Sequence, residues 1–309
     1  MRHQIIGLGV AILFAGAAVP ALAQDAKATE ILAAARKAIG DNKLDALKAL
    51  SVQASIQRNM ANMQMQTESE ILLELPDRYL KSDVSSGPMS MTMSTGFNGD
   101  KALLPAGASA MPGGGMMIRM GGGGAAMADP HGAAEKPTPE QQDQMNRAVV
   151  RNARHDISRL MLGWQAAAHP SLKAQYTYAG EAESPDGKAY VIDVKDDDGF
   201  AARLFIDQNS KLPLMLTYKG RLGRMVTSTA RQGGSAPPTD VKAAAAHTAQ
   251  PPPLVDFSLF FEDWRAVDGI NFPHVIRRAS EGATNEEWKI NKVKVNPKLD
   301  AKKFAVETR

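Results

Sequence analysis

The sequence predicts an α+β fold that is mainly β: a strongly curved antiparallel sheet, like an unfinished barrel, with an N-terminal helix and a second helix over it. The first indication is a two-residue apolar period within residues 174–306, where Tyr190, Ile192 and Val194 alternate with their neighbours. Residues two apart point to the same face of a strand. The second indication is the short polar turns between these segments, and the third is an amphipathic helical pattern after residue 138. A large curved sheet with one apolar face is typical of a container.

The first 23 residues are typical of a cleaved secretory signal peptide. A short basic start precedes an apolar stretch over residues 5–19, and small residues then mark a cleavage site between Ala23 and Gln24. No later stretch reaches the ~20 consecutive apolar residues that a spanning helix needs. We therefore expect a periplasmic protein without a transmembrane span in the mature chain.

Residues 24–309 are predicted to form a single domain that carries two loose segments. A helix is expected over residues 26–39, and strands over residues 50–59, 68–75, 79–85 and 89–97. Residues 105–137 are rich in glycine and methionine, and residues 233–253 are rich in proline and alanine. Such compositions bury little apolar surface on ordering, so we expect a flexible insertion and a flexible loop.

The clearest helix begins at a capping box, with Thr138 as the N-cap and Gln141 three residues later. Pro170 is expected to end it. An apolar stripe at helical spacing would cover the concave face of the sheet as a lid. Its residues are Val149, Ala153, Ile157, Leu160, Met161 and Trp164.

Composition argues against several function classes. The chain has 36 basic and 33 acidic residues, and this balance gives no basic surface of the kind that nucleic acids require. It has no cysteine, so disulfides, thiolate metal sites and acylation of the chain itself are not expected. Neither a spaced histidine metal motif nor a nucleophile–base motif occurs. The sequence predicts a protein that is not an enzyme and needs no cofactor.

Several short segments resemble the periplasmic outer-membrane lipoprotein carriers of the LolA/LolB-like superfamily. These are residues 70–79 (EILLELPDRY), 97–101 (FNGDK), 204–218 and 294–304. The resemblance implies a half-open antiparallel β-barrel with a helical lid, and a cavity that takes acyl chains. It also implies a non-enzymatic carrier of a lipid or lipoprotein acyl chain, with a partner protein at the inner or outer membrane. The segment 105–137 has no counterpart in the standard carrier, and no lid-tethering arginine is assigned, although Arg58 lies in a predicted strand.

Strand parity gives a candidate acyl-chain lining on the concave face. The opposite parity would exchange each residue for its neighbour. The candidates are Ile71, Leu73, Met91, Met93, Tyr190, Ile192, Leu214, Leu216, Phe257 and Leu259.

The 16 methionines leave two alternatives open. Met89, Met91 and Met93 share one strand face, and Met63 and Met65 share a face of a neighbouring segment. Thioethers select Cu(I), so these rows form a candidate copper site. The other interpretation is that they form a deformable apolar lining for acyl chains, because methionine is flexible and polarizable. A further hypothesis is an envelope sensor or protein-interaction module built on the same fold.

Overall fold

The structure is a computed structural model that describes residues 21–60, 63–85, 91–104, 108–110, 116–118, 138–185, 187–221 and 253–305. Residues 1–20 of the predicted signal peptide lie outside these ranges, as do most of the two predicted loose segments and Met89. The elements are α1 (Ala21–Ile39), α2 (Asn42–Asp45), β1 (Ala49–Met60), β2 (Met63–Glu74), β3 (Arg78–Ser85), β4 (Met91–Asn98), β5 (Lys101–Leu103), β6 (Ala108–Ala110), β7 (Met116–Ile118), α3 (Pro139–Gln165), β8 (Gln175–Ser184), β9 (Gly187–Lys195), β10 (Ala201–Asp207), β11 (Pro213–Arg221), β12 (Leu254–Val267), β13 (Ile270–Ser280), β14 (Ala283–Val295) and the 3₁₀ helix η1 (Ala301–Phe304).

Twelve of these strands form one antiparallel sheet, in the order β5-β4-β3-β2-β1-β14-β13-β12-β11-β10-β9-β8. Almost every neighbouring pair is consecutive in the chain; the pairing of β1 with β14 joins the N-terminal half of the sheet to the C-terminal half. The sheet curves without closing, because β5 and β8 remain its two edges. The predicted mainly-β fold with a half-open barrel is confirmed.

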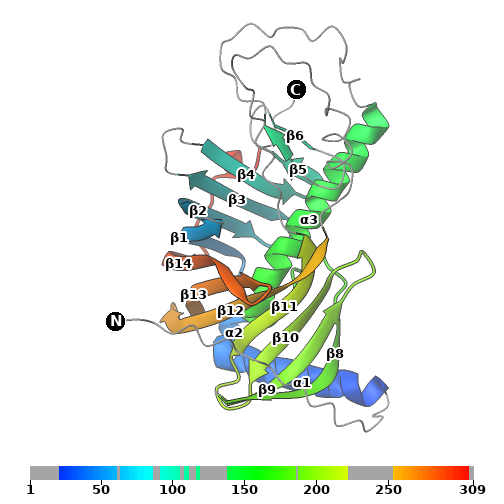
Figure 1. The fold of residues 1–309 in the computed structure, drawn as a ribbon, viewed down its shortest axis with the longest axis vertical. Helices are drawn as coiled ribbons and strands as arrows, with labels where there is room; N and C mark the ends of the chain where they lie inside the picture. The colour runs from blue at the N-terminus through cyan, green and yellow to red at the C-terminus, as the bar shows by residue number, and fades with distance from the viewer. Residues whose placement is uncertain are drawn as a thin grey trace, which may run out of the picture.

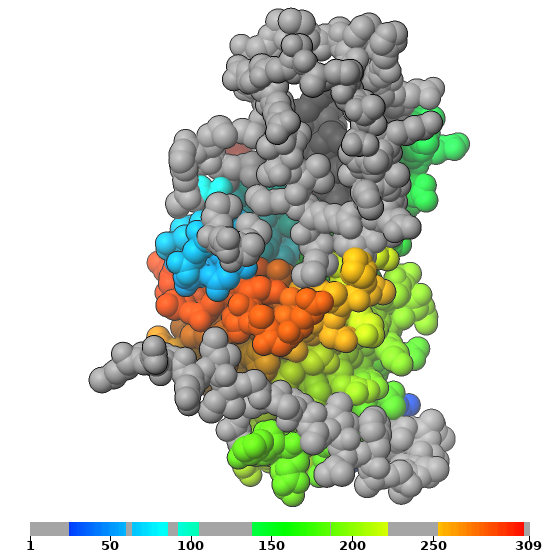
Figure 2. All heavy atoms as spheres, viewed as in Figure 1, coloured from blue at the N-terminus to red at the C-terminus, as the bar shows by residue number. Residues whose placement is uncertain are grey.

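Both long helices pack on the inner face of the sheet, the face that carries the main hydrophobic core. Helix α3 contacts β4 and β5 near one edge and β10, β11 and β13 in the other half, while α1 packs mainly against β8. Figure 1 shows α3 running the length of the molecule across the curve, with α1 at the end of α3 below β8–β11. Figure 2 shows β1, β14 and β13 filling the middle of one face of the molecule, where α3 is visible only at the edge.

Helix α3 begins as predicted and ends earlier than predicted. Gln141 donates its backbone N–H to the Thr138 side chain, and the Gln141 side chain accepts from the Thr138 backbone, so the capping box is confirmed. The helix ends at Gln165 because Ala166 takes a left-handed conformation, with φ 50° and ψ 34°. Pro170 therefore follows the end of the helix and does not cause it. No helix among the described residues has the length and apolarity to cross a membrane.

The segment 105–137, predicted as a flexible insertion, contains two short strands within its described part. β6 and β7 pair with each other as a separate antiparallel ribbon, and α3 contacts β6. Of the predicted loop 233–253, only Pro253 is described.

Candidate functional site

The apolar part of the inner face holds most of the candidate lining residues. Ile71, Leu73, Ile192, Leu216 and Leu259 are all buried in the main core. The strand register places them on one face: Leu73 pairs with Leu50, and Ile192, Leu204, Leu216 and Leu259 follow one another across β9–β12. The six predicted stripe residues of α3 are all buried, none more than 7% exposed, and all of them except Val149 belong to the same core. Helix α3 thus covers the apolar inner face with its own side chains.

The remaining candidate lining residues differ in how deeply they are buried. Phe257 is buried and its ring stacks on Tyr218, and Tyr190 is half-buried against the core. Met93 pairs with Asp83 and is 43% exposed. Met91 pairs with Ser85 in the strand register.

Leu214 is a correction to the sequence-based lining. The register between β10 and β11 shifts at this point, since Phe205 pairs with Met215 while Ile206 pairs with Pro213. Pro213 therefore takes the paired position beside Ile206, and Leu214 falls in the irregularity and is 41% exposed. Strict alternation does not survive a β-bulge, which adds a residue to one strand.

Two arginines fasten α3 to the two halves of the sheet. Arg154 donates from Nη2 to the carbonyl oxygen of Gly99 at 3.1 Å and to Oδ1 of Asp100 at 2.9 Å, in the turn between β4 and β5. Five residues further on, the Arg159 guanidinium lies 4.2 Å from the centre of the Tyr218 ring on β11. A cation over an aromatic face is attracted by the ring quadrupole. Helix α3 is therefore held across the curve at both sides.

The loop after α3 is fixed by a buried histidine. His169 donates its backbone N–H to Oγ of Ser158 at 3.2 Å, and its Nδ1 lies 2.7 Å from Oγ of Ser171. Its ring meets Phe97 on β4 edge-on, with the centroids 5.4 Å apart. Burial, and then the nearby charge of Arg154, lower the pKa of His169 from 6.5 to about 4. His169 is neutral at physiological pH.

This low pKa predicts a loss of stability in mild acid. Below pH 6.5 the unfolded chain takes up a proton at His169 before the folded chain does. The free energy of unfolding therefore decreases as the pH falls from 6.5 to about 4. The lowering corresponds to about 3 kcal/mol. Urea unfolding of the wild type and of His169→Asn should give free energies that fall between pH 6.5 and 4 more steeply in the wild type. Parallel curves would contradict this role of His169.

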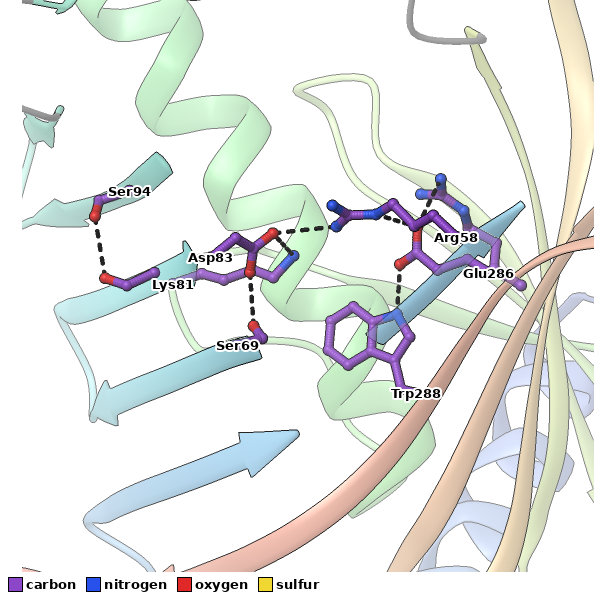
Figure 3. Close-up of polar contacts among 9 residues, drawn as sticks. Arg58, Ser69, Lys81, Asp83, Ser94, Glu286 and Trp288 are labelled. Atoms are coloured by element: carbon purple, nitrogen blue, oxygen red, sulfur yellow. Dashed lines mark hydrogen bonds and ion pairs between the residues drawn. The ribbon is translucent and has the colours of Figure 1, made fainter. Parts of the chain in front are cut away.

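Beyond the apolar rows, the inner face carries a set of connected polar side chains, shown in Figure 3. We call it the inner polar cluster: Arg58, Ser69, Lys81, Asp83, Arg278, Glu286 and Trp288.

Each carboxylate of the inner polar cluster has several partners. Oδ2 of Asp83 lies 3.1 Å from Nη2 of Arg58 and 3.1 Å from Nζ of Lys81, while Oδ1 accepts from Ser69 at 2.7 Å. Oε2 of Glu286 lies 3.1 Å from both Nε of Arg58 and Nη2 of Arg278. Arg58 thus bridges the two carboxylates, and these contacts join β1, β2, β3, β13 and β14.

Both carboxylates of the cluster are ionised at neutral pH. Burial opposes the ionisation of Glu286, but Arg278, Arg58 and Lys81 outweigh it and lower its pKa. Burial likewise opposes the ionisation of Asp83, and the charge of Lys81 with the hydrogen bond from Ser69 lowers its pKa. Trp288 is a third polar partner of Glu286, because its Nε1–H donates to the Glu286 carboxylate. Lys81 also lies 4.8 Å from the centre of the Trp288 ring.

Sequence reasoning missed this cluster and both fastening arginines. Arg58 and Glu286 are 228 residues apart, and no local spacing connects them. One signal was available in β1. Val52, Ile56 and Arg58 are separated by even numbers of residues, so the strand alternation places Arg58 on the same inner face as the buried apolar residues. A second was Arg154 and Arg159 within the amphipathic helix.

Met65 on β2 and Met93 on β4 both lie on the inner face, and β3 separates their strands. Met65 pairs with Arg58 on one side of β2, whereas Met93 pairs with Asp83 on β3. Met89 of the proposed copper set lies outside the described residues. Within the described ranges, no group of three or more His, Asp or Glu side chains is arranged to hold a metal ion. The copper hypothesis stays a prediction.

No protein-family model matches the chain, and no curated protein sequence matches it. Its structure is similar to a LolA superfamily protein from Nitrosomonas europaea, with 12% identity, 91% of this chain and 98% of the other covered, and a TM-score of 0.48. It is also similar to a protein domain from Vibrio parahaemolyticus described as outer membrane lipoprotein-sorting (12% identity, 91% and 97% covered, TM-score 0.44). A third similar structure is a DUF1329 family protein from Desulfovibrio piger (12% identity, 90% and 97% covered, TM-score 0.43). The likeness is one of fold alone.

Proposed function

We propose that this protein is a non-enzymatic periplasmic carrier that holds the acyl chain of a lipid or lipoprotein against the apolar inner face of its sheet. The observation that carries the proposal is the cover over that face. One helix, α3, buries a continuous apolar stripe against strands from both halves of the sheet and is fastened by side chains at two places. In the loaded protein, α3 would move outward and the acyl chain would take its place against the apolar inner face. The apolar stripe of α3 would then cover the bound chain.

The energetics of such an exchange are favourable to a carrier. Burying a twelve-carbon chain gives on the order of 10 kcal/mol, at ~0.8 kcal/mol per CH₂. The contacts that α3 gives up offset part of this gain, and so does the entropy lost by the bound chain. Because these costs reduce the net binding free energy, the cargo can be released as well as taken up. A partner protein at the inner or outer membrane would then deliver or receive the cargo.

The proposal is tested by a direct binding measurement. The chain beginning at Gln24 is purified from a periplasmic extract and analysed by native mass spectrometry for a co-purifying acyl species. It is then titrated with a fluorescent probe that carries a twelve-carbon acyl chain. We expect one saturable site per chain. Absence of both a co-purifying lipid and saturable probe binding would overturn the carrier proposal.

Leu160→Asp tests the lid role of α3. Leu160 lies in the buried stripe, and a carboxylate there would have to lose its water against either the sheet or the bound chain. We expect the probe to bind at least about tenfold more weakly, which corresponds to about 1.4 kcal/mol. Gln144→Asp introduces the same group at an exposed position of the same helix and should leave binding unchanged. Leu160→Ser repeats the test if the aspartate variant does not fold; equal binding by the variants and the wild type would remove the lid role.

A further inference from the structure

We propose that the inner polar cluster binds an anionic head group, a carboxylate or a phosphate, of an amphiphile whose acyl chain lies along the adjoining apolar rows. This rests on the proposed function and names the class of cargo: acidic amphiphiles rather than neutral ones.

The position of the cluster suits the polar end of such a molecule. On β1, Arg58 follows Ile56 at the next position of the inner face, and on β13, Arg278 follows Ile276 in the same way. Arg278 also pairs with Leu259 of the apolar lining. The charged side chains therefore begin where the buried apolar rows end, within one strand position. A head group at the cluster would leave its tail on the apolar surface.

The charge of the cluster leaves one cation in excess. Arg58, Lys81 and Arg278 carry three positive charges, while Asp83 and Glu286 carry two negative ones, which gives a net charge of +1. On the covering helix, Asp156 forms an ion pair with Arg159, and this pair adds no net charge that would cancel the excess. An anion would complete the charge balance, whereas a neutral alcohol would not.

Unused hydrogen-bonding capacity supports the same ligand class. Nε of Arg278 is buried and has no partner among the described residues. Oγ1 of Thr67 is likewise unpartnered, and Thr67 is only 1% exposed. Thr67 lies on β2, between β1 with Arg58 and β3 with Asp83, and it shares their face with Ser69. Buried polar groups are normally satisfied, so two unsatisfied donors beside an excess cation point to an acceptor that is bound there.

The cations of the cluster are also accessible to a ligand. The side chain of Arg278 is 38% exposed and that of Arg58 is 24% exposed, in contrast to 4% for Glu286. A buried ion network of this kind stabilises a fold less than apolar packing of equal volume would. Its presence on an otherwise apolar face is therefore better explained by recognition than by stability. Charge-assisted hydrogen bonds to a carboxylate or phosphate supply that recognition.

The experiment compares ligands that share one tail. Dodecanoate, dodecyl phosphate and 1-dodecanol, each below its micelle concentration, are made to displace the fluorescent acyl probe from the wild type. They are also tested on Arg278→Gln and on Arg277→Gln. Arg277 is the adjacent residue on β13, but it points to the outer face and pairs with Glu262, so it is a matched control for the same loss of charge. Lys81→Gln replaces Arg278→Gln if the latter does not fold.

We expect the wild type to prefer both anionic ligands over dodecanol by about tenfold or more, as for one charge-assisted hydrogen bond. Arg278→Gln should lose most of this preference while keeping its affinity for dodecanol, and Arg277→Gln should keep both. Equal affinity of the wild type for all three ligands would overturn the head-group site and leave the carrier proposal standing, as would an undiminished preference in Arg278→Gln and Lys81→Gln. Failure of all three ligands to displace a saturably bound probe would overturn the head-group site alone, whereas the carrier proposal falls only if the probe itself shows no saturable binding and no lipid co-purifies.

Discussion

Glu286→Gln is expected to lower the free energy of unfolding by about 3 kcal/mol. Removing one partner of a buried ion pair typically costs 3–5 kcal/mol, because the opposite charge stays buried without compensation. Glu286 is 4% exposed and binds two guanidinium groups, those of Arg58 and Arg278. Arg58 retains Asp83, and Arg278 is partly exposed to water, so the cost should lie near the lower end of that range. Urea unfolding at pH 7 measures it.

The pH dependence of the unfolding free energy shows whether Glu286→Gln acts by removing the charge or by changing the packing. The pKa of Glu286 is lowered below 4.5 in the folded protein, so its ionisation contributes stability above that pH. As the pH falls below 4.5, the wild type loses this contribution and the glutamine variant does not. The difference in unfolding free energy between the two proteins should therefore shrink in acid. A difference that stays constant from pH 7 to pH 3 would assign the cost to packing rather than to charge.

Glu287→Gln is the matched control. Glu287 is the next residue of β14, it points to the outer face, and its nearest cation is Lys289 at 3.6 Å. Pairs at the surface contribute about 0–1 kcal/mol, so this variant should stay within about 0.5 kcal/mol of the wild type. If the two glutamine variants were equally stable, the ion pairs of Glu286 within the inner polar cluster would not contribute to stability.

The parts of the fold that depend on local patterns were predictable from the sequence. The two-residue period identified strands. It placed Ile192 and Leu216 on one face correctly, because both residues pair with Leu204 in regular parts of the sheet. The capping box identified the start of α3 because Thr138 and Gln141 interact within one turn. In both cases the residues that determine the structure are close in the sequence.

The parts that depend on distant pairing were not predictable. Leu214 was misplaced because a bulge between β10 and β11 interrupts the alternation, and nothing in the sequence of β11 alone marks it. The inner polar cluster needs β1 beside β14, a pairing that joins the two ends of the chain. Arg154 and Arg159 could be seen on the helix, but their partners, Asp100 and Tyr218, lie on strands at opposite sides of the sheet.

Gly163→Ala tests a tight contact between α3 and β12, and it should destabilise the protein. In a helix interior, alanine is normally about 1 kcal/mol more favourable than glycine. Here the added Cβ would overlap the ring of Phe261 on β12, with the Cζ and Cε1 atoms nearest. Overpacking of a filled core costs about 1–3 kcal/mol, so steric overlap should reverse the usual sign. The measurement is the change in unfolding free energy in urea.

Phe261→Leu provides the compensating background, because leucine lacks the two ring atoms that lie nearest to the new methyl group. Phe261→Leu alone should cost stability, since a buried ring is lost. Adding Gly163→Ala to this background should then be neutral or stabilising, as the helix preference for alanine is no longer opposed. The double-mutant cycle should give a coupling energy of about 1 kcal/mol or more. If Gly163→Ala were equally destabilising in both backgrounds, the ring of Phe261 would not be what limits the approach of α3, and another contact of the helix would have to set its distance from the sheet.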